Sequence, residues 1–365
     1  MRFRAERETL ADAVAWASRT LPTRPTSPVL AGLRLEADNG VLTLSSFDHE
    51  VSSRVQVGVD VLESGSVVVP GRLLTDITRS LPSAPVEISH ETSRVALSCG
   101  RSAFTLPVMP ADDLPPLPTM PKEAGQISAP AFATAVAQVA VAAGRDDTLP
   151  MLTGMRVELR SQAITLAATD RYRLAVREIA WQAQHDDADV LVPARTIADT
   201  AKALASASMV HIALAGTHGL IGFESDGYRT TSRLLDFEFP TYRQLLPTEA
   251  SCVAQVKSSA LVDAVKRVSL VAERSAPVHL NFAGGEVHLR AGSGEEATAS
   301  EVLEGTIEGD PIQIAFNPGF LIDGISAVGE VDTTFRFVES RKPAVLTGAD
   351  GMAYRYLLMP IRLSG

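Results

Sequence analysis

Three copies of one sequence pattern follow one another along the chain, and this repetition limits how it can fold. Residues 28–34 (Pro-Val-Leu-Ala-Gly-Leu-Arg) recur 122 residues later, at 150–156, as Pro-Met-Leu-Thr-Gly-Met-Arg. Residues 44–48 recur at the same offset, at 166–170. Because two separate segments share one offset, they belong to a single duplicated unit.

A third, fainter copy of the unit is also present. Residues 69–77 recur at 192–200 and again at 316–324. The 365 residues therefore divide into three units of about 120, each of ordinary domain size. We expect domains at 1–121, 122–247 and 248–365. Three fused copies favour a function that needs extent or symmetry over one that needs a single asymmetric catalytic cleft.

Each unit is predicted to fold as helix, hairpin, strand, helix and hairpin. In the first unit, apolar residues at helical spacing predict a helix over 10–21 that Pro22 ends. Alternation with a period of two predicts a hairpin around the Asp-Asn-Gly turn at 38–40. The other elements expected in this unit are a strand at 67–69, a helix over 70–81 and a hairpin of 86–88 with 95–97. The helices expected in the later units are 132–143, 196–204, 261–271 and 320–328. We expect an α+β fold, with two helices per domain packed on antiparallel sheet.

The composition suits an intracellular protein with three cores. With 45% hydrophobic and 21% charged residues, three domains can form cores without disulfides or structural metals. Cys99 and Cys252 fall in different repeats without metal-binding spacing, which favours the reducing cytoplasm. The chain starts without an apolar leader, and its longest apolar stretch is interrupted by polar residues. We therefore expect a cytoplasmic protein with no membrane partner.

Catalysis has little support in the sequence. The seven histidines lack the His-Glu-x-x-His pattern, and only His279 and His288, which flank a Gly-Gly hairpin, could meet across it as metal ligands. Asp170 has the chemistry of an acid or base, but Asp48 stands at the same place in the first repeat, which indicates a structural role in a turn. We expect no catalytic residue, cofactor or metal. A hydrolase or transferase built on repeated α+β units would need a convergent polar cluster that the sequence lacks.

Four segments carry a resemblance to a known family. They are Arg-Pro-Thr-Ser-Pro-Val-Leu at 24–30, Thr-Asp-Arg-Tyr-Arg-Leu at 169–174, Phe-Pro-Thr-Tyr-Arg at 239–243 and Tyr-Leu-Leu-Met-Pro-Ile-Arg-Leu at 356–363. These segments resemble the bacterial DNA sliding clamp, the beta subunit of DNA polymerase III, across all three repeats. The excess of arginine over lysine, 28 to 5, and the Ser-Gly ending are similar to actinobacterial members.

The resemblance implies both a fold and a function. The implied fold is three sliding-clamp domains with helices lining the inside and antiparallel sheets outside, and two copies joined head to tail close a ring. The ring is implied to encircle double-stranded DNA without sequence specificity and to tether the replicative polymerase as a processivity factor. An additional clamp copy that gives tolerance to a clamp-binding antibiotic has the same fold and stays open as an alternative.

The implied partners are DNA, a second copy of the chain and several replication proteins. The proteins are the DNA polymerase III alpha subunit, the clamp loader, other polymerases and repair factors. They are implied to bind through short linear motifs of the type Gln-Leu-x-Leu-Phe. The resemblance implies that the dimer interface pairs Phe104 in domain one with Leu270 and Val271 in domain three of the second copy.

The distribution of charge reconciles a DNA partner with a formal net charge of −10. Cations fall on or beside the predicted helices and acidic runs fall in loops, which predicts a basic lining inside an acidic shell. The cations that we expect to touch phosphates are Arg24, Arg72, Arg145, Arg195 and Lys202. Solvated helix faces of mixed charge are the alternative, and the helix expected at 320–328 carries Asp323 and no cation.

A second expected site is an apolar groove for peptides. The resemblance implies a wall made of Leu152, Thr169, Arg171, Tyr172, Arg173, Leu174, Pro240, Gln244, Leu245, Leu357, Leu358, Met359, Pro360, Ile361 and Arg362. In the best-known clamps an arginine stands in place of Gln244, and a smaller residue and a histidine stand in place of Arg171 and Tyr172. Without the resemblance, the apolar segment at 357–361 is read as a buried edge strand.

Overall fold

The fold is given by a computed structural model that describes residues 1–184, 186–216, 219–247, 249–271, 276–292, 297–348, 351 and 353–361. It divides into two compact units. Unit one comprises residues 1–130, 183–185 and 203–234, and unit two comprises residues 131–182, 186–202 and 235–365. All the boundaries between these ranges fall inside the second sequence repeat, so the compact unit and the repeat are different divisions of the chain.

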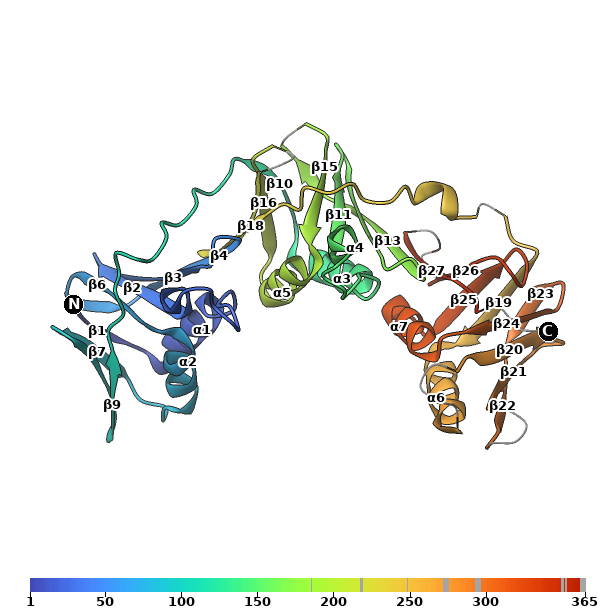
Figure 1. The fold of residues 1–365 in the computed structure, drawn as a ribbon, viewed down its shortest axis with the longest axis horizontal. Helices are drawn as coiled ribbons and strands as arrows, with labels where there is room; N and C mark the ends of the chain where they lie inside the picture. The colour runs from blue at the N-terminus through green and yellow to red at the C-terminus, as the bar shows by residue number, and fades with distance from the viewer. Residues whose placement is uncertain are drawn as a thin grey trace. The chain divides into compact units, whose positions relative to one another are not determined.

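Unit one is mostly antiparallel strand with two helices. Its elements are β1 (Arg2–Ala5), α1 (Arg7–Ala17), η1 (Pro28–Ala31), β2 (Gly32–Asp38), β3 (Val41–Phe47), β4 (Val51–Gly58), β5 (Asp60–Glu63), β6 (Gly65–Pro70), α2 (Gly71–Ser80), β7 (Val86–Glu91), β8 (Arg94–Cys99), β9 (Ser102–Pro107), β10 (Glu123–Ser128), β14 (Gln182–Ala183), β16 (Met209–Leu214), β17 (Leu220–Ser225) and β18 (Tyr228–Arg233). Helix α1 packs on β3 and β4 and lies beside α2 (Figure 1).

Unit two repeats this construction with more helices. Its elements are α3 (Ala129–Ala140), α4 (Pro150–Thr153), β11 (Gly154–Leu159), β12 (Ala163–Thr169), β13 (Arg173–Ala180), β15 (Ala188–Pro193), α5 (Ala194–Leu204), η2 (Arg243–Leu245), β19 (Cys252–Lys257), α6 (Ser258–Val268), η3 (Ser269–Val271), β20 (Val278–Ala283), β21 (Glu286–Ala291), β22 (Ala299–Glu304), β23 (Thr306–Gly309), β24 (Ile312–Phe316), α7 (Pro318–Val328), β25 (Asp332–Phe337), β26 (Ala344–Thr347) and β27 (Tyr354–Leu358). Helix α6 lies beside α7 (Figure 1). The α+β class expected from the sequence is confirmed.

Each nine-stranded sheet joins five strands of one repeat to four of another. In unit one the order is β14-β10-β16-β17-β18 followed by β4-β3-β2-β6, and in unit two it is β15-β11-β12-β13 followed by β27-β26-β25-β19-β23. The remaining sheets are the same two halves standing alone, with five strands in β5-β1-β7-β8-β9 and four in β22-β21-β20-β24. Within the described residues, β9 and β22 therefore end their sheets at an open edge.

The helices begin and end close to the positions that the apolar spacing predicts. Helix α1 ends at Ala17, short of the predicted residue 21, where the Arg19 amide bonds to the carbonyl of Trp16, three residues back, in place of the α-helical partner four residues back. Residues 269–271 form the separate 3₁₀ turn η3 after α6. The predicted order of elements omits β1, β4, β5 and β9, which are all strands of the sheets.

One correction concerns the end of the chain. Strand β27 is not an edge strand, because β13 pairs with it on one side and β26 on the other. The pairing with β13 joins residues far apart in the sequence, so the local apolar run could not indicate it, whereas β26 is the strand just before β27. The segment 359–361 continues beyond the strand.

A repeated turn confirms the structural role expected for two aspartates. Asp48 Oδ1 accepts bonds from the amides of Glu50 and Val51, at 3.0 and 2.7 Å. Asp170 Oδ1 accepts the two corresponding bonds, both at 3.0 Å. The residue after each aspartate, His49 or Arg171, has φ of 79°, in the left-handed region that non-glycine residues seldom adopt. The carboxylate offsets that backbone strain by closing the turn.

Candidate peptide-binding site and charged surfaces

Strands β13 and β27 place two of the expected groove segments side by side. The register sets Arg173 opposite Leu358 and Leu174 opposite Leu357. Beyond the strand, the amide of Met359 donates to the carbonyl oxygen of Tyr172 at 2.9 Å. Segments 169–174 and 357–359 therefore form one continuous surface in unit two.

A buried apolar cluster lies beneath this surface. Its members, which come from four strands and the linker between the second and third repeats, are Ala167, Leu174, Val176, Leu191, Phe239, Tyr242 and Leu357. Leu235 and Leu246 pack against it and are partly buried. Leu174 and Leu357 thus supply a fixed apolar floor. Phe239 and Tyr242 were not predicted as site residues, although two aromatics in a proline-containing linker were a signal that the linker is packed rather than solvated.

Large apolar side chains stand exposed around the buried cluster. Tyr172 is 59% exposed, Leu245 is 52% exposed and Met359 is 40% exposed. Leu245 is adjacent in sequence to Leu246, which packs on the floor, and Tyr172 and Met359 are each two positions from a floor residue, Leu174 and Leu357. An exposed apolar rim around a buried apolar floor is the arrangement that accepts apolar anchors of a peptide. Pro240 and Gln244 are also exposed, and Pro360 and Ile361 are half-buried.

Arg173 holds the turn of the rim instead of facing a ligand. Its Nε donates to Asp170 Oδ2 at 2.9 Å, and its Nη1 donates to Asp323 Oδ2 of α7 at 2.6 Å. Its guanidinium carbon lies 4.3 Å from the ring centroid of Phe320, and Tyr356 donates to the carbonyl oxygen of Phe320 at 2.8 Å. Burial lowers the pKa of Arg173, but its neighbours Tyr356 and Asp323 outweigh burial and raise that pKa, so the side chain stays charged.

Three expected wall residues of the described part of the chain, Leu152, Leu358 and Thr169, are placed differently from the rest. Leu152 is buried in α4, and it is not among the residues that form the floor in the described part of the chain. Leu358 is buried between β13 and β26. Arg362 lies outside the described residues. Thr169 is buried, and its hydroxyl donates to the carbonyl oxygen of Arg173 at 2.7 Å, so it supports the turn.

The junction of β18 with β4 has the same backbone arrangement as this site. There the amide of Arg233 donates to the carbonyl oxygen of Glu50 at 2.9 Å, as Met359 donates to Tyr172. The repeat therefore places a charged pair, Glu50 and Arg233, where the candidate site has two exposed apolar side chains.

The buried residues also differ between the two junctions, being polar at the β18–β4 junction and apolar at the candidate site. Ser52 and Thr231 lie opposite each other and share a hydrogen bond of 2.6 Å between their hydroxyls. They correspond to Leu174 and Leu357 of the candidate site. Of the two equivalent junctions, only the one in unit two offers an apolar surface.

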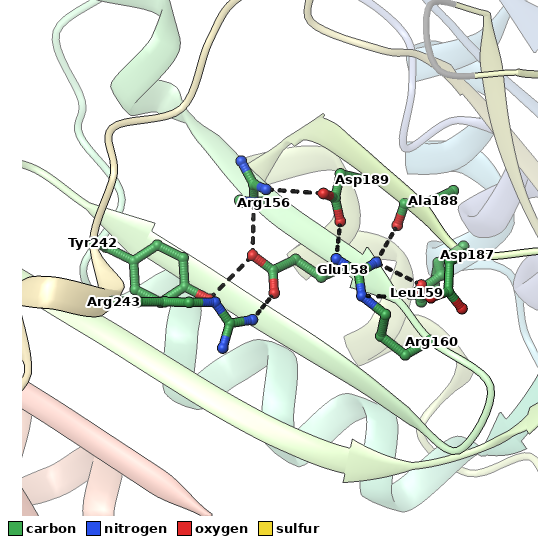
Figure 2. A network of polar contacts seen from close by, with 9 residues as sticks. All are labelled: Arg156, Glu158, Leu159, Arg160, Asp187, Ala188, Asp189, Tyr242 and Arg243. Carbon is green, nitrogen blue, oxygen red and sulfur yellow. Dashed lines mark hydrogen bonds and ion pairs between the residues drawn. The ribbon is translucent and has the colours of Figure 1, made fainter.

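The linker that carries Pro240, Gln244 and Leu245 is fixed by a buried carboxylate (Figure 2). Glu158 Oε1 accepts from Arg156 Nε at 2.8 Å and from the Tyr242 hydroxyl at 3.2 Å, and Glu158 Oε2 accepts from Arg243. Burial, and then the charge of Glu158, raise the pKa of Tyr242 to about 12, so its hydroxyl stays protonated and can donate.

All five cations expected to contact DNA are exposed on helices or beside them. They are Arg24, Arg72, Arg145, Arg195 and Lys202. Arg72 also donates to the carbonyl oxygen of Pro22 at 3.1 Å, and Arg195 lies 3.8 Å from the carboxylate of Asp199.

The described α-helices themselves carry only a small basic excess. Their cations are Arg7, Arg72, Arg79, Arg195, Lys202, Lys266 and Arg267, and their acids are Glu8, Asp12, Asp76, Asp199, Asp263 and Asp323. Asp323 is neutralised by Arg173, which explains how α7 tolerates an acid without a cation of its own.

The expected interface residues lie near the open sheet edges. Phe104 is half-buried on β9, the edge of the five-stranded sheet. Leu270 in η3 is 83% exposed and Val271 is half-buried. Turn η3 follows α6, which packs against β21 and the edge strand β22.

No catalytic arrangement is present among the described residues. His288 Nε2 lies 3.0 Å from Glu286, and the strand register sets His279 opposite Arg290 instead of opposite His288. Groups of three or more potential metal ligands are absent from the described part of the chain. Cys99 and Cys252 are buried and free. None of the described helices combines the length and apolarity of a membrane-spanning segment.

Comparison with known protein families covers nearly the whole chain. Residues 1–118, 126–241 and 243–362 match the N-terminal, central and C-terminal domains of the DNA polymerase III beta subunit. The beta sliding clamp of Streptomyces coelicolor is 52% identical over the full length of both chains. The beta sliding clamp of Micrococcus luteus is 46% identical over 84% of this chain and all of the relative.

Two further comparisons bear on the same fold. The beta sliding clamp homolog GriR of Streptomyces muensis is 42% identical over 99% of both chains. The sliding clamp of Pseudomonas aeruginosa, solved bound to griselimycin, superposes with a TM-score of 0.93 at 28% identity and covers both chains fully.

Proposed function

Because the chain belongs to the DNA polymerase III beta subunit family, we propose that it works as a DNA sliding clamp that holds the replicative polymerase on double-stranded DNA. The observation that carries this function is the match of all three repeats to the three domains of that family. The protein is a processivity factor without catalytic activity of its own. Three domains at 1–121, 122–247 and 248–365 remain our proposed division.

We propose that two copies close a ring by completing the two incomplete sheets. The five-stranded sheet that ends at β9 is equivalent to the five-stranded halves that end at β18 and β27. The four-stranded sheet that ends at β22 is equivalent to the four-stranded halves that end at β4 and β13, which are joined to those five-stranded halves within units one and two. Pairing β9 of one copy with β22 of the other makes a third nine-stranded sheet and leaves neither edge open.

The repeat also supports a register for this interface. Thr230 lies opposite Ser53 at one junction, and Tyr356 lies opposite Ala175 at the other. Phe104 is the corresponding residue of β9, because the interval from position 104 to 230 equals the interval from 230 to 356. The corresponding residue of β22 is at position 299, so Phe104 faces Ala299 of the second copy.

The apolar surface of unit two, built on Leu174, Leu357, Tyr172 and Met359, is the proposed docking site for short linear motifs. Two apolar anchors, a Leu and a Phe, contribute about 1.5–3 kcal/mol each. Backbone hydrogen bonds and the other peptide contacts add to the anchors and offset the cost of ordering the peptide, and the expected micromolar affinity corresponds to about −8 kcal/mol. Such binding lets the DNA polymerase III alpha subunit, the clamp loader, other polymerases and repair factors exchange at one site.

DNA contacts are proposed to be weak and independent of sequence. Arg24, Arg72, Arg145, Arg195 and Lys202 are the proposed phosphate contacts. Phosphate contacts position a protein without reading bases, and a small basic excess keeps the ring free to slide. Retention comes from the closed ring and not from affinity, and we place this activity in the cytoplasm.

The test of this function compares two DNA substrates. Protein loaded onto circular DNA should stay bound as salt is raised, whereas protein bound to short linear duplex should dissociate, because salt weakens phosphate contacts but not threading. Retention is measured by gel filtration of the DNA with labelled protein. Equal loss from both substrates would rule out encirclement.

A second candidate role is that of an additional clamp copy that confers antibiotic tolerance. The 42% identity to GriR favours considering it, although the Streptomyces coelicolor beta sliding clamp is more similar. Depletion of the protein in its own cells separates the roles. Replication should stop if this is the housekeeping clamp and continue if it is an extra copy.

A further inference from the structure

The linker that carries part of the docking site is attached through two consecutive side chains. Tyr242 places its ring in the buried cluster beside Phe239, with the ring centroids 6.1 Å apart. Arg243 begins the 3₁₀ turn η2, whose next two residues are Gln244 and Leu245. The positions of Gln244 and Leu245 therefore depend on how Tyr242 and Arg243 are held.

Both side chains are held by one carboxylate, that of Glu158 in β11 (Figure 2). The Glu158 side chain is 3% exposed, and three donors from Arg156, Tyr242 and Arg243 occupy its two oxygens. A buried carboxylate is stable only when such partners compensate for the missing hydration. The linker supplies two of the three donors, so the buried charge and the linker conformation depend on each other.

A second carboxylate, that of Asp189, holds Arg156 on the side away from the linker. Arg156 donates to Asp189 Oδ2 at 3.1 Å, and Arg160 donates to Asp189 Oδ1 at 2.7 Å (Figure 2). Arg156 is thus fixed between Glu158 and Asp189. The contact between Arg156 and Asp189 involves no residue of the linker.

The first repeat contains the same pair without the anchoring function. Arg34 and Glu36 stand at the positions of Arg156 and Glu158, and their side chains lie 3.4 Å apart. The Glu36 side chain is 45% exposed, and its ion-pair partner within the described residues is Arg34. The duplicated pair is therefore an exposed ion pair in one repeat and a buried linker anchor in the next.

We propose that Glu158 is a positioning residue for the docking site. It fixes turn η2 through Tyr242 and Arg243 and thereby presents Gln244 and Leu245 at the edge of the apolar floor. This inference rests on the proposed peptide-docking function. Because Glu158 lies beneath the linker, it acts on a bound peptide only through the linker.

The experiment compares Glu158→Gln with Glu36→Gln in the full-length protein. A fluorescein-labelled synthetic peptide containing Gln-Leu-x-Leu-Phe is titrated by fluorescence anisotropy. Glu158→Gln should raise the Kd by about tenfold, which corresponds to about 1.4 kcal/mol, because the amide has no charge to pair with Arg243 and one acceptor oxygen in place of two. Glu36→Gln should leave the Kd unchanged.

A second readout reports the linker directly. Hydrogen exchange followed by mass spectrometry should show faster exchange of the Leu245 and Leu246 amides in Glu158→Gln, because these amides bond within the turn. Exchange in β12 and β13 should not change. Trypsin should also cleave faster after Arg243.

Tyr242→Phe provides a variant that removes one hydroxyl and keeps the ring in the core. It should change affinity and linker exchange in the same direction as Glu158→Gln, to a smaller extent. If the wild type fails to bind the peptide, the proposed docking function is wrong. The positioning role is overturned if the wild type binds and Glu158→Gln and Tyr242→Phe bind the peptide as tightly as the wild type. It is also overturned if these two variants bind more weakly but show no faster exchange in the linker.

Discussion

The guanidinium group of Arg173 binds a carboxylate in its own turn and another in α7. The sequence suggested that Arg173 lines the groove and that Asp323 is an unbalanced acid on a helix facing DNA. The structure joins these two observations, because each residue neutralises the other. No local pattern could predict the pair, since it forms between distant segments.

Replacing Arg173 with alanine should lower the free energy of unfolding by about 3–5 kcal/mol, because Asp170 then stays largely buried without its partner. Urea denaturation followed by circular dichroism measures the change. Asp323→Asn should lower it by less than about 1 kcal/mol, because the Asp323 side chain is 44% exposed. Equal losses in both variants would contradict the assignment of Arg173 as a buried anchor.

Removing the apolar side chains of the docking site should abolish peptide binding. Met359→Ala combined with Leu174→Ala removes one rim and one floor residue, and truncating a buried Leu alone costs about 2–5 kcal/mol. Anisotropy measures binding, and light scattering checks that the dimer persists. The matched control is Arg233→Ala, which alters the residue equivalent to Met359 at the other junction and should bind peptide normally. Unchanged affinity in a folded double variant would remove this surface as the site.

The elements that depend on local pattern were predictable from the sequence, and those that depend on distant pairing were not. The hairpin at 38–40 follows from its Asn-Gly turn, and the helices follow from apolar spacing. Strand β4 was missed because its buried Ser52 and Ser53, which lie against β18 of another repeat, give no apolar alternation. Strand β9 was missed although it forms a local hairpin with β8. The docking segments came from family resemblance, but Glu158 and Tyr242 did not, since a buried ion pair leaves no periodic signal.

The edges of β9 and β22 give the interface a testable register. Phe104→Cys combined with Ala299→Cys should form intermolecular disulfides under mild oxidation, because directly opposite residues bring their Cβ atoms to about 4.5–5.5 Å. Non-reducing electrophoresis detects the covalent dimer. Phe104→Cys with Ser300→Cys shifts the second cysteine to the other face of the sheet and should link far less. Efficient linking of the shifted pair instead would show that the proposed register is wrong.

For the molecule as a whole, a net charge of −10 and a nearly balanced set of helix charges predict weak DNA contacts. Arg195→Ala combined with Lys202→Ala should make the salt dependence of binding to linear duplex shallower, by about 0.9 for each phosphate that the variant no longer neutralises. Anisotropy at several salt concentrations gives this slope. Lys342→Ala, in an exposed loop, should leave the slope unchanged. A slope unaltered by the double variant would remove both residues from the DNA contacts.

The contrast between the two junctions sets the valency of the assembly. Each chain has one apolar junction and one polar junction, so the proposed docking function gives a dimer two docking sites, enough for two partners at once but not four. Positions 50, 52, 231 and 233 hold the polar and charged residues that distinguish the other junction. Placing Tyr, Leu, Leu and Met at these positions would give each chain a second docking site. Partners that compete for one docking site could then bind the same chain together.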